Sequence, residues 1–201
     1  MNTAPPLEGL VLCGGESRRM GRDKGSLLRE GKTWAAVAGE LLQPFVNTVY
    51  YSIRHEQRPV YEALLPGASL LTDEPDLAGR GPLGGLLSFH RYHPGDSCFL
   101  LACDLPFMEA FVLQQILAVY RESPGADAFL YRSPQSLEPM AAIYSAKWME
   151  GLQQKIEQGK IRNYGFQAAL AQAQVVTLPW NETIAASFRN ANDPDALTGI
   201  Q

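Results

Sequence analysis

The sequence lacks the features that would identify it as a nucleic-acid-binding or membrane protein. Its 17 basic residues are outnumbered by 21 acidic ones, so the formal net charge is −4. A mildly acidic chain has no overall positive field to attract DNA or RNA, and any phosphate binding must therefore be local. No apolar run approaches the roughly 20 residues that span a bilayer, and the N-terminus lacks the basic and apolar stretches of a secretory signal. We therefore expect a cytoplasmic protein with no membrane or nucleic-acid partner.

Cysteine and histidine are too scarce to build a familiar metal or nucleophile site. The three cysteines, Cys13, Cys98 and Cys103, are odd in number and lack the spacing of a zinc site, so they are predicted to be buried thiols. His90 and His93 are one helical turn apart, but no third ligand follows, and we predict that they lie at a helix C-terminus. Cys103 has no histidine in a matching motif, which argues against a thiol nucleophile.

What the sequence does have is length and alternating structure. With 201 residues and 46% hydrophobic content, the chain can bury a substantial core. Continuous apolar strands alternate with helical patterns, which predicts an α/β fold, a Rossmann-like three-layer sandwich with a mostly parallel central sheet. Ligands of such sheets bind at the carboxyl ends of the strands. Strands are predicted at residues 7–13, 46–53, 68–72, 97–103, 127–132, 139–145 and 174–178, and helices at 33–45, 83–92, 107–122, 147–158, 164–172 and 193–197.

The loop after the first predicted strand, residues 12–24, carries the strongest local signal. Gly14 and Gly15 let the backbone turn sharply and approach a ligand without a side chain in the way. Four basic residues then fall within seven positions, which in an acidic chain favours a polyphosphate site over an exposed basic turn. The loop is neither a Walker A motif nor a dinucleotide fingerprint. The four basic residues are Arg18, Arg19, Arg22 and Lys24.

Two aspartates follow predicted strands. Asp104 closes the apolar strand at residues 97–103, where it could either hold a hard cation or cap the next helix. Asp73 follows the strand at residues 68–72 and opens a glycine-rich segment that ends at Gly85. This segment is either part of a binding site or a surface turn.

Three segments of the sequence resemble one known family. Residues 12–24 fit Leu-x-Gly-Gly-x-Ser-x-Arg-Met-Gly-x-Asp-Lys, which resembles the signature loop of the molybdenum cofactor guanylyltransferases. Residues 81–85 (Gly-Pro-Leu-Gly-Gly) and 103–107 (Cys-Asp-Leu-Pro-Phe) resemble two further segments of that family. Asp23 resembles the guanylyl branch, since the related cytidylyl branch tends to have proline there. The resemblance implies a nucleotidyltransferase with a single domain over residues 1–201, in which 1–125 bind the nucleotide and 126–201 the acceptor.

The resemblance also implies roles for individual residues. The backbone from Leu12 to Gly15 would wrap the nucleotide, and Ser52 occupies a position where the guanylyl family usually presents asparagine. The implied catalytic residues are Lys24, Asp104 and Arg18, with Asp104 as the Mg²⁺ ligand; the nucleotide-binding residues are Leu12, Cys13, Gly14, Gly15, Lys24, Ser52, Asp73 and Asp104; the acceptor-binding residues are Arg162, Asn190 and Asn192.

The implied reaction transfers GMP from GTP to the terminal phosphate of molybdopterin or a related pterin cofactor and releases pyrophosphate. The attacking phosphate is already anionic, so positioning and charge neutralisation by Mg²⁺ and basic side chains would suffice. Other proteins of cofactor biosynthesis or molybdoenzyme maturation are possible partners. Two alternatives stay open: a cytidylyltransferase or sugar-phosphate nucleotidyltransferase of the same fold, and a nucleotide-binding accessory protein without turnover.

Overall fold

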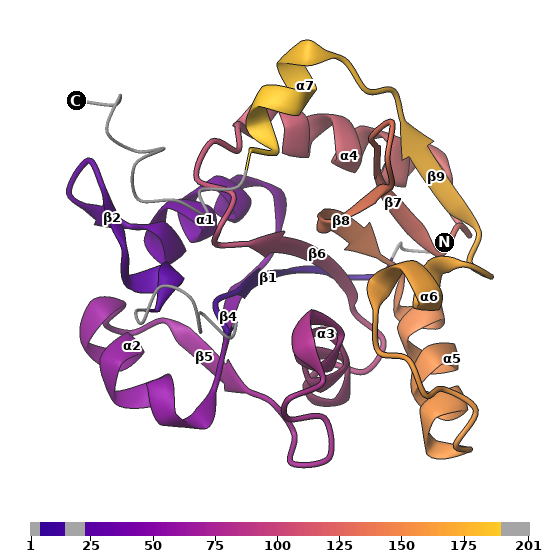
Figure 1. The fold of residues 1–201 in the computed structure, drawn as a ribbon, viewed down its shortest axis with the longest axis horizontal. Helices are drawn as coiled ribbons and strands as arrows, with labels where there is room; N and C mark the ends of the chain where they lie inside the picture. The colour runs from indigo at the N-terminus through magenta and orange to yellow at the C-terminus, as the bar shows by residue number, and fades with distance from the viewer. Residues whose placement is uncertain (1–4, 15–22, 190–201) are drawn as a thin grey trace.

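The computed structural model describes residues 5–14 and 23–189. Its centre is a seven-stranded sheet in the order β5-β4-β1-β6-β8-β7-β9, and β2 and β3 form a separate small hairpin (Figure 1). The strands are β1 (Leu7–Leu12), β2 (Leu28–Arg29), β3 (Lys32–Thr33), β4 (Val49–Ile53), β5 (Ser69–Thr72), β6 (Ser97–Ala102), β7 (Ala128–Arg132), β8 (Leu137–Tyr144) and β9 (Val175–Leu178).

The pairing confirms the predicted mostly parallel sheet. Strand β1 runs parallel to β4 and β6, and β4 runs parallel to β5. Leu12, at the end of β1, is in register with both Ser52 and Ala102, so the carboxyl ends of these strands meet at one edge. Strand β8 is antiparallel to both β6 and β7, whereas β9 is again parallel to β7.

Helices cover both faces of the sheet, which gives the predicted three layers. Helices α1, α4 and α7 contribute to one hydrophobic core and α3, α5 and α6 to the other, and Figure 1 shows the two groups on opposite sides of the strands. The strands feed alternate side chains to the two cores: Val11 belongs to the first and Leu12 to the second. The helices are α1 (Trp34–Leu42), α2 (Arg58–Leu64), α3 (Gly81–Tyr92), α4 (Ala110–Glu122), α5 (Ala146–Glu157), α6 (Phe166–Leu170) and α7 (Glu182–Ser187).

One boundary error changes the interpretation of Asp104. The helix predicted to begin at residue 107 begins at Ala110, and its N-cap is Glu109. Asp104 therefore does not cap α4, and that alternative was wrong. The physical reason is a tight turn between strand and helix, in which the N–H of Met108 donates to the carbonyl of Leu105 (3.1 Å).

Three other elements were not predicted. The β2–β3 hairpin, α2 and α7 are all short, and none of them shows a long periodic pattern in the sequence. The single-turn 3-10 helices η1 (Lys24–Ser26), η2 (Gln43–Phe45) and η3 (His55–Gln57) were not predicted as separate elements either. The helix predicted at residues 193–197 lies outside the described residues.

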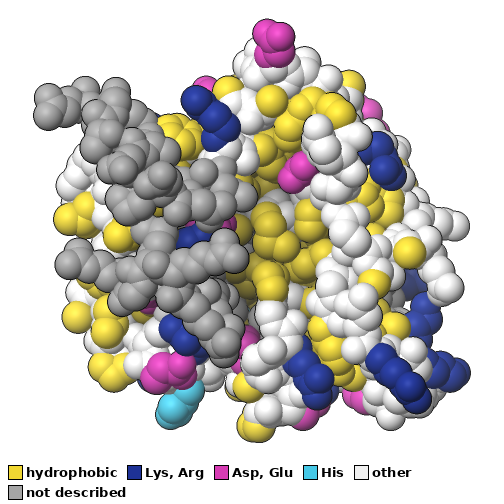
Figure 2. Space-filling model, in the orientation of Figure 1, with side chains coloured by type: hydrophobic (Ala, Val, Ile, Leu, Met, Phe, Trp, Pro, Cys, Tyr) yellow, Lys and Arg dark blue, Asp and Glu magenta, His cyan; other side chains and the backbone are white. Residues whose placement is uncertain are grey.

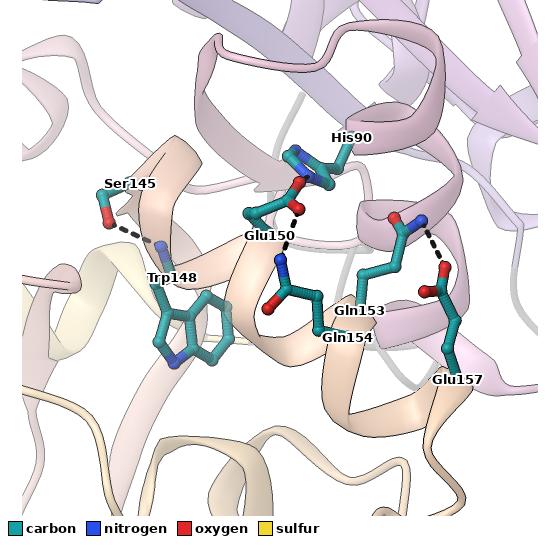
Figure 3. A network of polar contacts seen from close by, with 7 residues as sticks. All are labelled: His90, Ser145, Trp148, Glu150, Gln153, Gln154 and Glu157. Atoms are coloured by element: carbon teal, nitrogen blue, oxygen red, sulfur yellow. Dashed lines mark hydrogen bonds and ion pairs between the residues drawn. The ribbon is translucent and has the colours of Figure 1, made fainter.

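The histidines and cysteines have structural roles, as predicted. Figure 3 shows His90, which is buried in α3, in contact with Glu150 of α5 (Nε2 to Oε2, 3.1 Å). His93 is the C-cap of α3. Within the described residues, no three His, Cys, Asp or Glu side chains form a candidate metal cluster. All three cysteines are buried free thiols. Among the described helices, none is both long and apolar enough to cross a membrane.

Candidate nucleotide and metal site

The backbone at the end of β1 is hydrogen-bonded to the ends of both neighbouring strands, β4 and β6. The N–H groups of Cys13 and Gly14 both donate to the carbonyl of Ser52 (2.9 and 3.1 Å). The N–H of Cys103 donates to the carbonyl of Leu12 (3.1 Å). Because the first two loop donors are used within the sheet, any loop N–H offered to a phosphate must come after Gly14. Those next positions, including Gly15, lie outside the described residues.

Three of the predicted nucleotide-binding side chains gather around Gly85 in the first turns of α3. A Cβ atom at Gly85 would lie 2.7 Å from the Ser52 hydroxyl oxygen, 3.0 Å from Leu12 Cδ2 and 3.6 Å from Asp73 Oδ1. The neighbouring Gly84 is equally restricted, since its Cβ would lie 2.6 Å from the carbonyl oxygen of Leu77. Glycine at these positions lets α3 pack directly beneath the strand ends, and we call Leu12, Ser52, Asp73 and Gly85 the Gly85 cluster.

Asp73 is the ionisable member of the Gly85 cluster. Burial at the end of β5 raises the pKa of its carboxyl to about 6. A ligand that donates hydrogen bonds to this carboxylate would favour its ionised form, because such bonds stabilise the charge. Burial of Asp73 disfavours its charged form, and the carboxyl lies beside Gly85 near the start of α3. Asp73 is therefore a good candidate for binding a ligand that presents several hydrogen-bond donors.

Asp23 stabilises the segment that begins with Lys24. Its carboxylate accepts hydrogen bonds from the N–H of Gly25 (3.0 Å), from Gln57 Nε2 (2.6 Å) and from the Tyr61 hydroxyl (3.1 Å). Burial raises the pKa of Tyr61, so its hydroxyl remains a donor. A side chain at Gly25 would overlap that hydroxyl. Asp23 thus anchors η1, which begins with Lys24, to the segment from η3 to α2.

Lys24 and Asp104 are brought together from positions 80 residues apart. Lys24 Nζ donates to Asp104 Oδ2 at 3.0 Å, and the two side chains are 23% and 30% exposed. Lys24 begins η1, whereas Asp104 lies two residues past Ala102, the last residue of β6, which is in register with Leu12. The sequence predicted both as phosphate or metal residues, and the structure places them in one contact at the carboxyl edge of the sheet.

The Cys103 thiol, next to Asp104 in the sequence, is poorly suited to act as a nucleophile. A hydrogen bond with Cys13, together with burial, raises the pKa of the Cys103 thiol well above its ordinary value. A protonated, buried thiol is a poor nucleophile. Cys13 and Cys103 are both buried side chains of the hydrophobic core to which α1 and α4 contribute.

The residues present suit a hard divalent cation held partly by substrate. Mg²⁺ in phosphate-transfer sites is commonly bound through one or two carboxylates plus phosphate oxygens and water. Asp104 offers one partly exposed carboxylate next to a lysine, and no second carboxylate is needed if phosphates complete the coordination. The donor set therefore fits a metal that arrives with a nucleotide.

The predicted acceptor side is assembled differently. Arg162 is exposed, in a segment (159–165) without helix or strand. In the same segment Tyr164 lies under the guanidinium of Arg80, 4.7 Å from its Cζ to the ring centroid. Arg80 precedes α3, so this contact links the loop before α3 to the acceptor side. The predicted residues Arg18, Asn190 and Asn192 lie outside the described residues.

Sequence reasoning missed several residues that build this site. Gln57 and Tyr61 hold Asp23, and Arg29 and Phe107 contact each other beside Asp104, 5.5 Å from guanidinium carbon to ring centroid. Phe107 ends the 103–107 segment without having been assigned a role, and the other three belong to no recognised motif. The available signal was weak: Gly25 directly after Lys24 indicated that something packs closely there.

Comparison with known proteins agrees with the geometry. A family model for the MobA-like NTP transferase domain matches residues 9–175. A probable molybdenum cofactor guanylyltransferase of Methanothermobacter thermautotrophicus is 30% identical over 190 residues, which cover 93% of this chain and 95% of that protein. Another from Nostoc sp. is 33% identical, with coverage of 97% and 90%.

A solved structure extends the match to the whole fold. The molybdopterin-guanine dinucleotide biosynthesis protein A of Archaeoglobus fulgidus superposes with a TM-score of 0.76 at 26% identity, and the match covers 96% of each chain. The family match spans β1 through the start of β9 and so includes the Gly85 cluster, Lys24 and Asp104. The chain therefore belongs to the MobA-like NTP transferase family of nucleotidyltransferases.

Proposed function

We propose that this protein transfers GMP from GTP to the terminal phosphate of molybdopterin or the molybdenum cofactor, with release of pyrophosphate. The observation that carries the proposal is the Lys24–Asp104 contact, which lies at the same sheet edge as the Gly85 cluster in a chain of this family. The relatives at 30% and 33% identity are themselves named molybdenum cofactor guanylyltransferases.

Asp104 would hold Mg²⁺, and the metal would neutralise charge on the nucleotide phosphates when bound. Lys24, already at hydrogen-bond distance from that carboxylate, would contact the same phosphates. The attacking group is an anionic phosphate, so no side chain has to remove a proton from it. The work of the chain is to place two anionic groups together, which is possible only where their charge is compensated.

The Gly85 cluster would hold the nucleoside. Guanine presents N1–H and N2–H₂ donors on one edge, and the two oxygens of the Asp73 carboxylate could accept both. Cytosine lacks this pair of donors. Ser52, where the resemblance leads one to expect asparagine, has a shorter reach, and its hydroxyl is buried beside Gly85. We expect Asp73 to contribute more to base choice than Ser52.

The acceptor would bind on the side of β7, β8 and the segment 159–165. The middle of the face drawn in Figure 2 is largely hydrophobic, with basic side chains around it. Such a surface suits a flat pterin with an anionic phosphate. Arg162, together with Asn190 and Asn192, is proposed to contact this group.

Pyrophosphate release tests the proposal directly. Purified protein is incubated with Mg²⁺ and a molybdopterin-type acceptor, with GTP, CTP, ATP or UTP supplied in turn. We expect GTP to be used at least tenfold better than CTP, which corresponds to about 1.4 kcal/mol.

Each alternative predicts a different outcome of the same assay. A preference for CTP would place the protein in the cytidylyl branch. Turnover with a sugar phosphate, but not with the pterin acceptor, would identify a sugar-phosphate enzyme. Tight GTP binding without pyrophosphate release from any combination would identify an accessory protein.

A further inference from the structure

Phe107, three residues after Asp104, is held between two arginines from distant parts of the chain. The guanidinium carbon of Arg29 lies 5.5 Å from the ring centroid, and that of Arg189 lies 5.0 Å from it. Both distances are within the range of cation–π attraction. Arg29 belongs to β2, and Arg189 follows the last turn of α7.

Arg29 makes a second contact that Arg189 lacks. Its Nη1 donates a hydrogen bond to the carbonyl of Pro106, so one guanidinium holds both the backbone and the ring of the segment after Asp104. Arg189 instead donates through Nε to the carbonyl of Ala186, in its own helix (3.3 Å). A planar guanidinium can lie against an aromatic ring while its edge donates to a carbonyl, a geometry that the compact ammonium group of lysine does not reproduce.

The hairpin that carries Arg29 is fixed by contacts of its own. Its turn residues Glu30 and Gly31 both have positive φ (51° and 80°), as a tight two-residue hairpin turn requires. Lys32 pairs with Glu40 of α1 (2.7 Å), and the N–H of Trp34 donates to the carbonyl of Leu27 (2.8 Å). These contacts fix the hairpin that carries Arg29, and this hairpin begins only a few residues after Lys24.

The Lys24 segment and the Asp104 turn are thus joined twice. One link is the Lys24–Asp104 ion pair, which is partly exposed and would be rearranged when phosphates and metal arrive. The other is the contact of Arg29 with Pro106 and Phe107, which involves no group proposed to touch substrate. The second link can keep the two segments in place while the first is exchanged.

We propose that Arg29 is a positioning residue for nucleotidyl transfer, which holds the turn after Asp104 so that its carboxylate meets the metal and the phosphates. The inference rests on the proposed function, because it assumes that Asp104 binds metal. It adds a residue outside the three loop segments that resemble the family, and it predicts a defect in metal binding that loss of a surface charge would not produce.

The test measures Mn²⁺ binding by electron paramagnetic resonance in the presence of a non-hydrolysable GTP analogue, for the parent, Arg29→Gln and the matched control Lys32→Gln. Both variants remove one cation from the same hairpin, but Lys32 faces α1. We expect Arg29→Gln to weaken Mn²⁺ binding about tenfold, or about 1.4 kcal/mol, and to lower kcat. Nucleotide affinity measured in EDTA and the Tm should stay close to the parent values.

Arg29→Lys separates positioning from charge. If only positive charge mattered, lysine would restore Mn²⁺ affinity; since the carbonyl and the ring must be held together, we expect at most partial recovery. Parent-like Mn²⁺ binding by Arg29→Gln would overturn the inference while leaving the proposed function intact. Mn²⁺ binding by the parent that does not change in Asp104→Asn would overturn both.

Discussion

The two ends of the central sheet present their candidate residues in different ways. On the side of β5, β4, β1 and β6, the candidate residues gather at the edge where these parallel strands end. The Gly85 cluster surrounds one glycine of α3, and Lys24 contacts Asp104. On the side of β8, β7 and β9, the one candidate residue within the described part of the chain, Arg162, is exposed in a segment without regular structure. The described residues predicted to bind the nucleotide are therefore grouped at one edge of the sheet, whereas the one predicted to bind the acceptor lies in a loop.

Strand direction contributes to this difference, because β8 is the one strand of the seven-stranded sheet that runs opposite to the others. Parallel strands end at the same edge, so residues just past their ends are brought to one level by the register itself. Strand β8 runs against β6 and β7, and its carboxyl end, at Tyr144, pairs with Cys98 near the start of β6. The start of β8, at Leu137, therefore lies at the edge where the parallel strands end.

The largest effect is expected at Asp104. Asparagine is neutral and a weaker ligand for Mg²⁺, so Asp104→Asn should reduce GMP transfer by orders of magnitude. Because the Lys24–Asp104 pair is partly exposed, the Tm should change little. Pyrophosphate release and thermal denaturation measure the two quantities.

Asp96→Asn is the matched control, since it makes the same substitution near the opposite end of β6, where Asp96 lies 3.9 Å from His93. It should retain parent activity. An Asp104→Asn enzyme that turns over at the parent rate would remove the metal site from its proposed position.

At Asp73 we expect two smaller effects of opposite sign, a gain in stability and a loss of nucleotide affinity. Burial raises the pKa of this carboxyl to about 6 from an ordinary value of 3.8. Between these two pH values the folded state binds more protons than the unfolded state, so ionisation of Asp73 costs stability as the pH rises, and the full cost is present above pH 6. Asp73→Asn should remove this loss and raise the Tm at pH 7.

The same substitution should weaken nucleotide recognition. An amide has one acceptor oxygen in place of two, so we expect GTP affinity to fall about tenfold, equivalent to about 1.4 kcal/mol, while CTP affinity changes less. In the parent protein the GTP preference should decline below pH 6, where Asp73 is protonated. A variant with both lower Tm and unchanged GTP preference would contradict the assignment.

The smallest effect is expected at Arg162. Its side chain is exposed, so Arg162→Ala should leave the Tm and GTP affinity unchanged and raise the KM for the pterin acceptor several-fold. Lys147→Ala removes an exposed cation near the start of α5 and should change neither KM. If Arg162→Ala and Lys147→Ala have the same KM for the acceptor, Arg162 does not belong to the acceptor site.

Strong local patterns explain what was correct in the sequence-based analysis. Buried strands such as β1 and β6 are continuous apolar runs, and α3 and α4 are long and periodic, so their existence follows from residue type and spacing. Short elements such as α7 carry too few residues for a period to be distinguished from chance. The sheet edge that gathers Lys24 and Asp104 was also predictable, because parallel strands deliver their following residues to one side.

What the sequence alone determined is the set of side chains and the edge at which they meet: glycines after β1, Lys24, Asp73 past β5 and Asp104 past β6. Only the tertiary structure decided which nearby side chains hold the backbone of this edge in place. Asp23 lies within the same motif as Lys24, yet its carboxylate is occupied by Gln57 and Tyr61. The physical reason is that motifs fix neighbours along the chain, whereas hydrogen-bond partners and ring contacts arise between segments far apart in sequence, and their geometry exists only after the layers have packed.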